Sequence, residues 1–307
     1  MSISELYGEL RPRAFSIAYQ MLGSISETED VVQEAFLRMH QALQRDERID
    51  SPRAYITTLV TRLAIDQFRS ARARRERYVG EWLPEPLAAE STPADQVEIV
   101  DSLSLAFLVL LESLTPHQRA AFLLRDVFEY PYSEVADIIG TDVDGTRHLV
   151  ARARTHVRKH RSRYNATPRQ RDELARRFFA ATERGDLSSL EELLARDVTL
   201  HVDGGGKVPA QLRPVNGRQR VARALVGAMS VLSRRGVHVH ATEVNGRPGA
   251  VTVDEDERPT GVLGLDFHDG RIGAIYFIAN PDKLQRVGRV GGHDLLRAGP
   301  HSGEAGA

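Results

Sequence analysis

The spacing of apolar residues changes once along this chain of 307 residues, and that change limits its fold more than any other feature. In the first half apolar residues recur at helical spacing, as between Thr28 and His40. Beyond Pro168 the pattern changes, and from Val198 to Val202 apolar and polar residues alternate, which is typical of a strand. The sequence therefore predicts a multidomain protein, all-α at first and α+β towards its C-terminal end.

Prolines and changes in composition give the boundaries between the predicted domains. Residues 1–80 and 99–165 are predicted to be two helical domains, the second with a helix–turn–helix. Between them, residues 81–98 combine three prolines with acidic residues, which indicates a linker because helix interiors rarely tolerate proline. Residues 168–287 form the predicted α+β domain, and the Gly- and His-rich tail, 288–307, is expected to be disordered.

The C-terminal domain is predicted to contain two helices, a strand, a helix and four further strands. The helices are expected at about 168–183, 186–195 and 218–232, and the strands at 198–203, 237–244, 250–253, 262–267 and 272–278. Asp269-Gly270 is a strong hairpin signal between the last two strands. This order favours a small α+β domain with a curved antiparallel sheet.

The net charge of −1 hides a strong asymmetry along the chain. From Glu81 to Asp101 there are six acidic residues and no Lys or Arg, whereas from Gly145 to Arg171 there are nine basic residues and no acid. A shorter basic cluster lies between Arg69 and Arg77. Any one such run can be a solvated helix face, but two basic segments on apolar-periodic helices indicate a polyanionic partner.

Cap residues predict a helix–turn–helix in the second helical domain. Thr115 begins a capping box, Ser133 can cap a helix that ends at Gly140, and Asp142 can cap the next helix. The helix that follows Asp142 is rich in arginine. Arg147, His148 and Ala151 share one of its faces, with Arg152 beside them. Because arginine pairs with guanine or phosphate, this helix is predicted to enter the DNA major groove.

Three segments, in order, resemble extracytoplasmic-function sigma factors. The segment EDVVQEAFLR, residues 29–38, resembles the helix that binds core RNA polymerase. Residues 54–66 and the following RSARARRERY resemble the region 2 helices that melt and read the -10 promoter element. Residues 114–122, YSEVA at 132–136 and the Arg-Ala-Arg of 152–154 resemble region 4, which reads the -35 element.

This resemblance implies two partners, core RNA polymerase and promoter DNA, and assigns residues to each. The residues implied in polymerase binding are Asp30, Gln33, Glu34 and Arg38. Those implied on the -10 side are Arg62, Asp66, Arg69, Arg72, Arg74 and Arg75. Those implied on the -35 side are Arg147, His148, Ala151, Arg152 and Arg154.

The remainder, residues 168–284, resembles the SnoaL-like, nuclear-transport-factor-like cone fold. Three motifs are similar to signatures of the sigma-factor subgroup that carries this fused domain: WLPEP at 82–86, DGGGK at 203–207 and NPDKL at 280–284. The resemblance implies that the domain regulates the sigma core, with no separate anti-sigma protein. We hypothesise that Lys207 and Lys283 face the acidic linker at Glu81 and Glu85 as a latch; a glycine turn and a helix cap are the alternative. The residues expected in this interdomain role are Trp82, Pro84, Glu85, Asp203, Gly204, Gly205, Gly206, Lys207, Asn280, Asp282 and Lys283.

Two other functions stay open. Some cone-fold relatives are enzymes, and the residues that could line such a pocket are His201, Asp203, His240, Asp266, His268 and Tyr276. A helix–turn–helix regulator whose cone senses a small ligand is the other alternative, although it has no use for a polymerase-binding helix.

Neither a metal nor a cofactor is expected. His238 and His240 share a strand face, but such a pair is more often structural or exposed than metal-binding. The chain has no Cys, no run long and apolar enough for a membrane span and no readable signal peptide, so we expect a cytoplasmic protein. The resemblance to sigma factors implies binding without bond-making chemistry, so we do not expect an enzyme.

Overall fold

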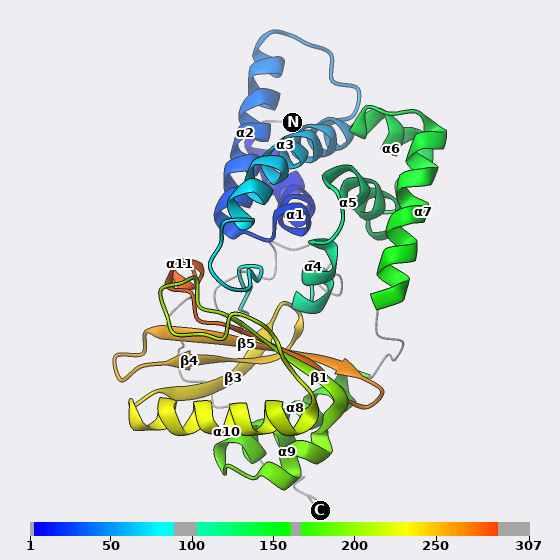
Figure 1. Ribbon diagram of the computed structural model, residues 1–307. Helices are drawn as coiled ribbons and strands as arrows, with labels where there is room; N and C mark the ends of the chain where they lie inside the picture. Colours follow the sequence, from blue (N-terminus) through cyan, green and yellow to red (C-terminus); the bar gives the residue numbers. More distant parts are fainter. Residues whose placement is uncertain (1–2, 89–102, 161–166, 288–307) are drawn as a thin grey trace, which may run out of the picture. The chain divides into compact units, whose positions relative to one another are not determined.

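The computed structural model describes residues 3–88, 103–160 and 167–287, and the expected C-terminal tail lies outside them. The chain divides into two compact units. Unit 1 comprises residues 1–85 and 92–161, and unit 2 comprises residues 86–91 and 162–307. Figure 1 follows the chain through the elements of both units, which are described separately below.

Unit 1 is helical, as the spacing of apolar residues predicts. Its elements are α1 (Ile3–Leu22), α2 (Ile25–Gln44), α3 (Pro52–Arg75), α4 (Leu105–Leu111), α5 (Pro116–Phe122), the π-helical turn η3 (Leu123–Val127), α6 (Tyr132–Ile139) and α7 (Val143–His160). Helices α1, α2 and α3 pack on one another, and α3 also packs against α5 and α6. The predicted helical domains 1–80 and 99–165 are therefore parts of a single compact unit.

Most helix ends in unit 1 follow from local hydrogen bonding. Thr115 and Gln118 form the expected capping box at α5, and Gly140 ends α6 in the left-handed conformation, with φ 71°. The Asp142 side chain accepts a hydrogen bond from the Gly145 backbone N–H at the start of α7, as predicted. The predicted Ser133 cap is wrong, since α6 begins at Tyr132, two residues earlier than a Ser133 cap implies, and follows Pro131 without a side-chain cap.

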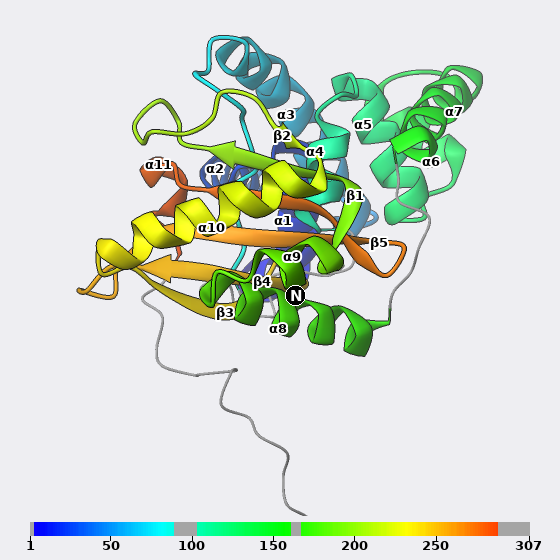
Figure 2. The same ribbon diagram turned by 60° about the horizontal axis from the view of Figure 1, so that its bottom comes forward.

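Unit 2 consists of one six-stranded sheet, one face of which is covered by the helices between residues 168 and 234 (Figure 2). Its elements are α8 (Pro168–Glu183), α9 (Leu187–Leu193), β1 (Leu194–Asp203), β2 (Val215–Asn216), α10 (Arg218–Arg234), β3 (His238–Val244), β4 (Arg247–Val253), β5 (Pro259–His268), β6 (Arg271–Ile278) and α11 (Pro281–Leu284). The strand order is β2-β1-β6-β5-β4-β3. Asp269 and Gly270 form the predicted β5–β6 turn, both with positive φ.

The sheet is mixed, which corrects the expectation of an antiparallel sheet. Strands β3, β4, β5 and β6 pair antiparallel in sequence order, but β1 pairs with β6 in parallel. The α10 crossover and the β3–β5 strands separate β1 from β6 along the chain, so these two strands meet only through the tertiary fold. Strand periodicity alone carries no information on such a pairing.

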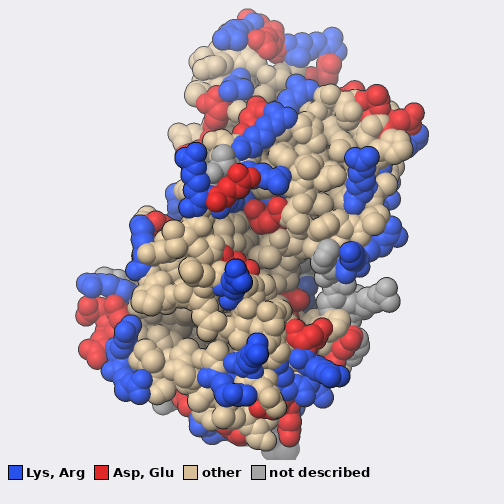
Figure 3. Space-filling model, viewed as in Figure 1, with Lys and Arg blue, Asp and Glu red and all other residues tan. Residues whose placement is uncertain are grey.

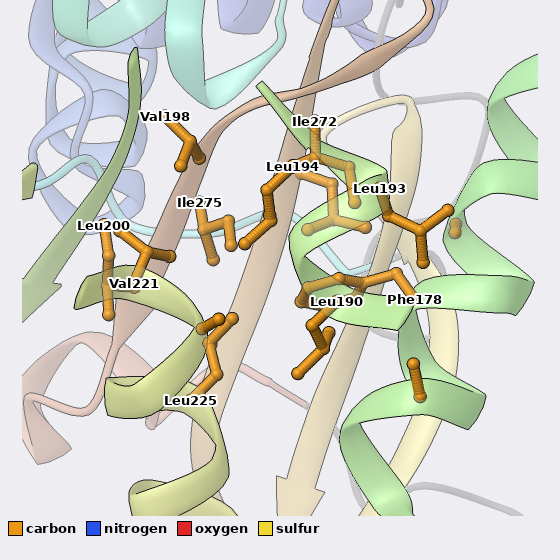
Figure 4. Close-up of a cluster of buried hydrophobic side chains, with 14 of the residues drawn as sticks. Phe178, Leu190, Leu193, Leu194, Val198, Leu200, Val221, Leu225, Ile272 and Ile275 are labelled. Atoms are coloured by element: carbon orange, nitrogen blue, oxygen red, sulfur yellow. The ribbon is translucent and has the colours of Figure 1, made fainter. Parts of the chain in front are cut away.

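Apolar side chains fill the space between the helices and the sheet of unit 2 (Figure 4). Phe178 of α8, Leu190 of α9 and Leu225 of α10 point towards Val198 of β1 and Ile275 of β6. Within the described residues, none of the helices combines the length and the apolar character that a membrane span requires.

Candidate nucleic-acid and polymerase interfaces

Helix α7 carries an exposed face on which most of the predicted -35 residues lie. Its buried face consists of Val150, Ala153 and Val157, which fixes the helix on unit 1. The opposite face is exposed and contains Arg147, His148, Ala151, Arg152, Thr155, Arg158 and Lys159. Figure 3 shows Lys and Arg side chains along the part of unit 1 that α7 occupies. This face combines basic, polar and small residues, as a helix in the major groove requires.

Arg154 lies off this exposed face and has a structural role. Its guanidinium donates two hydrogen bonds to the Asp126 carboxylate in η3, at 2.8 and 2.6 Å. The hydrogen bonds to Asp126 raise the pKa of Arg154 above its already high ordinary value. Arg154 thus ties α7 to the preceding helical turn, because two of its guanidinium nitrogens are bonded to Asp126 in this conformation.

Two of the predicted -10 residues bind region 4 within unit 1. Arg62 of α3 donates hydrogen bonds to the backbone oxygens of Asp137 and Ile138, at 2.8 and 2.9 Å, near the end of α6. Arg75 donates to the Glu112 carboxylate and to the Leu22 backbone oxygen. In this conformation both arginines hold the two helical regions together, which the sequence did not predict.

The remaining predicted -10 residues lie towards the end of α3. Asp66, Arg69 and Arg72 are exposed, and Asp66 and Arg69 form an i,i+3 ion pair at 3.3 Å. The Arg74 side chain lies outside the described part of the structure. Arg69 also lowers the pKa of His117 in α5, although burial of that imidazole is the larger cause.

A buried charged cluster joins the helices of residues 1–80 to those of residues 99–165. Arg119 of α5 is fully buried and donates to Glu112 at 2.6 Å and to the Gln20 backbone oxygen at 2.8 Å. Burial lowers the pKa of Arg119, and Glu112 opposes that effect. Glu112 accepts from Arg75 as well, so one carboxylate bridges two arginines from different regions. We call Arg75, Glu112 and Arg119 the arginine clasp.

The predicted polymerase-binding residues share the exposed side of α2. Val31, Val32, Ala35, Phe36 and Met39 form the buried side, as their spacing predicts. Asp30, Gln33 and Arg38 are exposed, and the half-exposed Glu34 carboxylate accepts a hydrogen bond from Arg38 at 2.7 Å. Leu37 stands among them with 48% of its surface exposed.

The linker motif that begins at Trp82 packs on region 2. The Arg75 guanidinium lies 3.6 Å from the centroid of a Trp82 ring, a cation–π contact. A Cβ at Gly23 would approach Trp82 to 3.0 Å and Pro84 to 3.4 Å, so the turn before α2 fits against both. The Glu85 carboxylate accepts hydrogen bonds from the Ser24 hydroxyl and the Ile25 N–H, both at 2.7 Å, at the start of α2.

The other two motifs bind each other at the ends of β1 and β6. Asp203 and Lys283 form a buried ion pair at 2.7 Å, and Lys207 pairs with Asp282 at 2.7 Å nearer the surface. The Asn280 side chain caps α11 by accepting from the Asp282 N–H. Gly204, Gly205 and Gly206 form the loop between them, and a Cβ at Gly205 would lie 2.4 Å from Asn280.

These partners correct the hypothesis that the two lysines face the acidic linker. Lys207 and Lys283 are bonded to Asp282 and Asp203, and Glu85 is bonded at the start of α2. Each lysine is thus paired with a carboxylate inside unit 2, and the Glu85 carboxylate is hydrogen-bonded inside unit 1. Residue type and spacing predicted that these groups form ion pairs, but not with which partner.

The residues considered for an enzyme pocket do not line the interior of the cone. In each strand their neighbours point to the helices, as Leu200 and Val202, Leu265 and Phe267, or Ile275 do. Alternation along a strand therefore places the six candidates on the other face of the sheet: His201, Asp203, His240, Asp266, His268 and Tyr276. There the His201 and Tyr276 rings stack at 5.0 Å, and burial raises the pKa of Asp266 to about 6.

Sequence reasoning missed four residues that the structure places at contacts between elements: Glu112, Arg119, Asp126 and Asn245. For Arg119 a sequence signal exists, because its spacing from the apolar Phe122 puts it on the inner side of α5. The partners lie 7 to 158 residues away in the sequence, so no local pattern connects them.

Models of known families match three parts of the chain in the order that the structure shows. Sigma-70 region 2 matches residues 6–74, Sigma-70 region 4 matches residues 104–157 and the SnoaL-like domain matches residues 175–273. The first two matches cover the helices of unit 1, including the exposed faces of α2 and α7. These elements define a bacterial sigma factor with a fused SnoaL-like domain.

Individual relatives share the whole arrangement. The chain is 37% identical to the ECF RNA polymerase sigma factor SigJ of Mycobacterium tuberculosis over 298 residues, 92% of this chain and 93% of SigJ. It is 32% identical to the probable ECF RNA polymerase sigma factor SigI of the same species, over 92% of this chain and 94% of SigI. The crystal structure of SigJ matches with a TM-score of 0.74 and 34% identity, over 93% of this chain and 99% of that one. The protein belongs to the ECF RNA polymerase sigma factor family.

Proposed function

We propose that this sigma factor binds core RNA polymerase through the exposed side of α2 and reads the -35 promoter element with the exposed face of α7. The polymerase contacts are Asp30, Gln33, Glu34 and Arg38, around the exposed Leu37. The -35 contacts are Arg147, His148, Ala151 and Arg152. Arg154 is left out of this set because Asp126 holds its guanidinium.

The exposed face of α7 is the observation that carries the proposal. Its side chains can reach base edges and phosphates, while Val150, Ala153 and Val157 keep the helix fixed. Arg147 is exposed, and its ion pair with Asp144 at 2.8 Å is also on the surface. Surface pairs of this kind are worth little, so Arg147 can exchange Asp144 for DNA at small cost.

On the -10 side, the proposal assigns DNA contacts to Asp66, Arg69, Arg72 and Arg74 at the end of α3. Arg62 and Arg75 join this set only when region 4 moves away from region 2, because both now bind region 4 groups. Promoter binding and separation of the two regions are therefore coupled in this proposal. Separation would also free the end of α6, which Arg62 now caps.

The proposal gives regulation to the C-terminal domain itself, without a separate anti-sigma protein. Its support is the fusion of the domain to the sigma regions, which SigJ shares over almost its whole length. A catalytic role in the cone finds no support, because the six candidate residues face away from its interior and apolar side chains fill it. No observation favours a ligand-sensing repressor over a sigma factor.

A transcription assay with purified components tests this function. Core RNA polymerase without a sigma factor is mixed with the full-length protein and a DNA library with randomised -35 and -10 positions, and the transcripts are sequenced. We expect transcripts from a defined promoter class only when the protein is present. The double variant Arg147→Ala/Arg152→Ala should lose them, and Glu173→Gln, an exposed position on α8, is the matched control. No transcripts from the wild type would refute the proposal.

A further inference from the structure

The turn between β3 and β4 is buried, although hairpin turns usually face solvent. Asn245 and Gly246 form it with φ values of 52° and 71°, the left-handed conformation that Asn and Gly tolerate best. Only 2% of the Asn245 surface is exposed, and Val244 before it is also buried. The burial of a polar turn residue indicates that this turn binds another segment.

That segment is the linker between regions 2 and 4. The Asn245 backbone N–H donates a hydrogen bond to the Leu87 oxygen at 2.8 Å, and the Leu87 N–H donates to the Asn245 Oδ1 at 3.0 Å. Ala88 pairs antiparallel with Val244, and the Leu87 side chain is buried. One asparagine thus satisfies both backbone polar groups of Leu87, in the manner of a strand added to a sheet edge.

The residues just before this segment are fixed in unit 1. The Glu85 N–H donates to the Gly23 oxygen at 2.8 Å, and the Tyr19 hydroxyl donates to the Glu85 oxygen at 2.5 Å. Only Pro86 separates Glu85 from Leu87, and proline has a fixed φ. The linker is therefore held by region 2 at one residue and by the C-terminal domain two residues later.

We propose that the β3–β4 turn is a docking site for the linker and that Asn245 sets how far apart regions 2 and 4 can reach on DNA. This inference rests on the proposed function. A docked linker has less conformational freedom than a released one, so the two regions span a narrower range of distances between promoter elements. The C-terminal domain acts on promoter choice through this contact, not through Lys207 and Lys283.

Three full-length variants separate this role from folding. Asn245→Gly keeps the positive φ of the turn but removes the side-chain acceptor of Leu87. Asn245→Asp keeps an acceptor oxygen and a residue that tolerates the turn, so it is the matched control. Leu87→Pro removes the same hydrogen bond from the linker side and leaves the sequence of the C-terminal domain intact.

Hydrogen exchange at the Leu87 amide tests the docking. We expect Asn245→Gly to speed that exchange about tenfold, as the loss of one hydrogen bond implies, while the exchange in β5 and β6 stays as in the wild type. Asn245→Asp should exchange like the wild type. Wild-type protection of Leu87 in Asn245→Gly would overturn the docking contact.

Transcription from promoters of different spacer length tests the consequence. A promoter selected with the wild-type protein is remade with one or two base pairs added to or removed from the spacer. We expect the preference of the wild type for the selected spacer to fall about threefold or more in Asn245→Gly and Leu87→Pro, and to persist in Asn245→Asp. An unchanged preference in both would overturn the inference. No transcription by the wild type would instead refute the proposed function and leave the exchange result standing.

Discussion

The contact between regions 2 and 4 in unit 1 and the core of unit 2 differ in the chemistry of what they bury. Regions 2 and 4 meet through the arginine clasp and through Arg62, which binds backbone oxygens of α6. The C-terminal domain buries Phe178, Leu190 and their apolar neighbours between helices and sheet. Polar interfaces within a chain resemble those of partners that separate, whereas apolar cores stay closed. The difference predicts that regions 2 and 4 separate more readily than the helices and the sheet of the cone.

The largest effect is expected from a substitution in the apolar core of unit 2. Phe178→Ala should lower the unfolding free energy of unit 2 by about 3–5 kcal/mol, because Phe178 is fully buried and its loss leaves a cavity. Scanning calorimetry measures the loss, and hydrogen exchange should assign it to unit 2. Leu187→Ala, at an exposed position of α9, is the control. Equal effects of the two substitutions would contradict the role of this core.

The next largest effect is expected at Glu112, in the polar contact between regions 2 and 4. Glu112→Gln should cost about 3 kcal/mol, because it leaves the buried Arg119 without a counter-charge. Regions 2 and 4 should then separate more often. The chain has no Cys, so Gln41→Cys and Thr155→Cys allow two dyes to be placed specifically, on α2 and α7.

Energy transfer between these dyes measures the separation. We expect a lower mean transfer efficiency for Glu112→Gln than for the wild type, and no change for the exposed Glu173→Gln. If transfer stays the same while stability falls, the clasp stabilises unit 1 without controlling its opening.

A third prediction concerns the pH dependence of the unfolding free energy, which we expect Asp266 in unit 2 to influence. Burial raises the pKa of Asp266 from 3.8 to about 6, so between these values the unfolded chain releases a proton that the folded chain keeps. The unfolding free energy therefore falls as pH rises through this window, by at most about 3 kcal/mol, and the loss is complete above it. Asp266→Asn lacks this loss, so its advantage over the wild type should grow from pH 4 to pH 6. A constant difference in urea titrations across that window would show that Asp266 is not responsible.

The smallest expected effect concerns the exposed face of α7. Arg147→Ala should weaken holoenzyme binding to a selected promoter by about 1–3 kcal/mol, a typical value for an arginine that pairs with a base. It should leave the stability of unit 1 unchanged, because Arg147 is exposed. Fluorescence anisotropy of labelled DNA measures the affinity, with Arg176→Ala on α8 as the control. Equal affinities for the two variants would remove Arg147 from the interface.

Much of the fold could be predicted from the sequence because its signals are local. Thr115 and Gly140 fixed the ends of α5 and α6, and the Asp269-Gly270 turn fixed the last hairpin. The exposed faces of α2 and α7 also followed from helical spacing. These features depend on neighbours within a few residues, so a single sequence contains them.

The partners of charged residues could not be predicted in the same way. Arg62, Arg75 and Arg154 look like DNA-binding residues in the sequence, yet each binds a group of unit 1. An arginine has the same chemistry towards a phosphate, a carboxylate or a backbone oxygen. Only the position of those groups in space decides which one it meets.

The sequence by itself thus determined the class of most segments: which of them are helical, where strands alternate, and which helix is basic. The tertiary structure alone decided that β1 lies parallel to β6, that Glu112 bridges two arginines, and that Asn245 holds the linker at Leu87. The physical reason is the separation along the sequence between the groups that bind each other. Helix caps and turns are satisfied within a few residues, whereas these contacts join groups that are distant in sequence and gain their strength only where the folded chain excludes water.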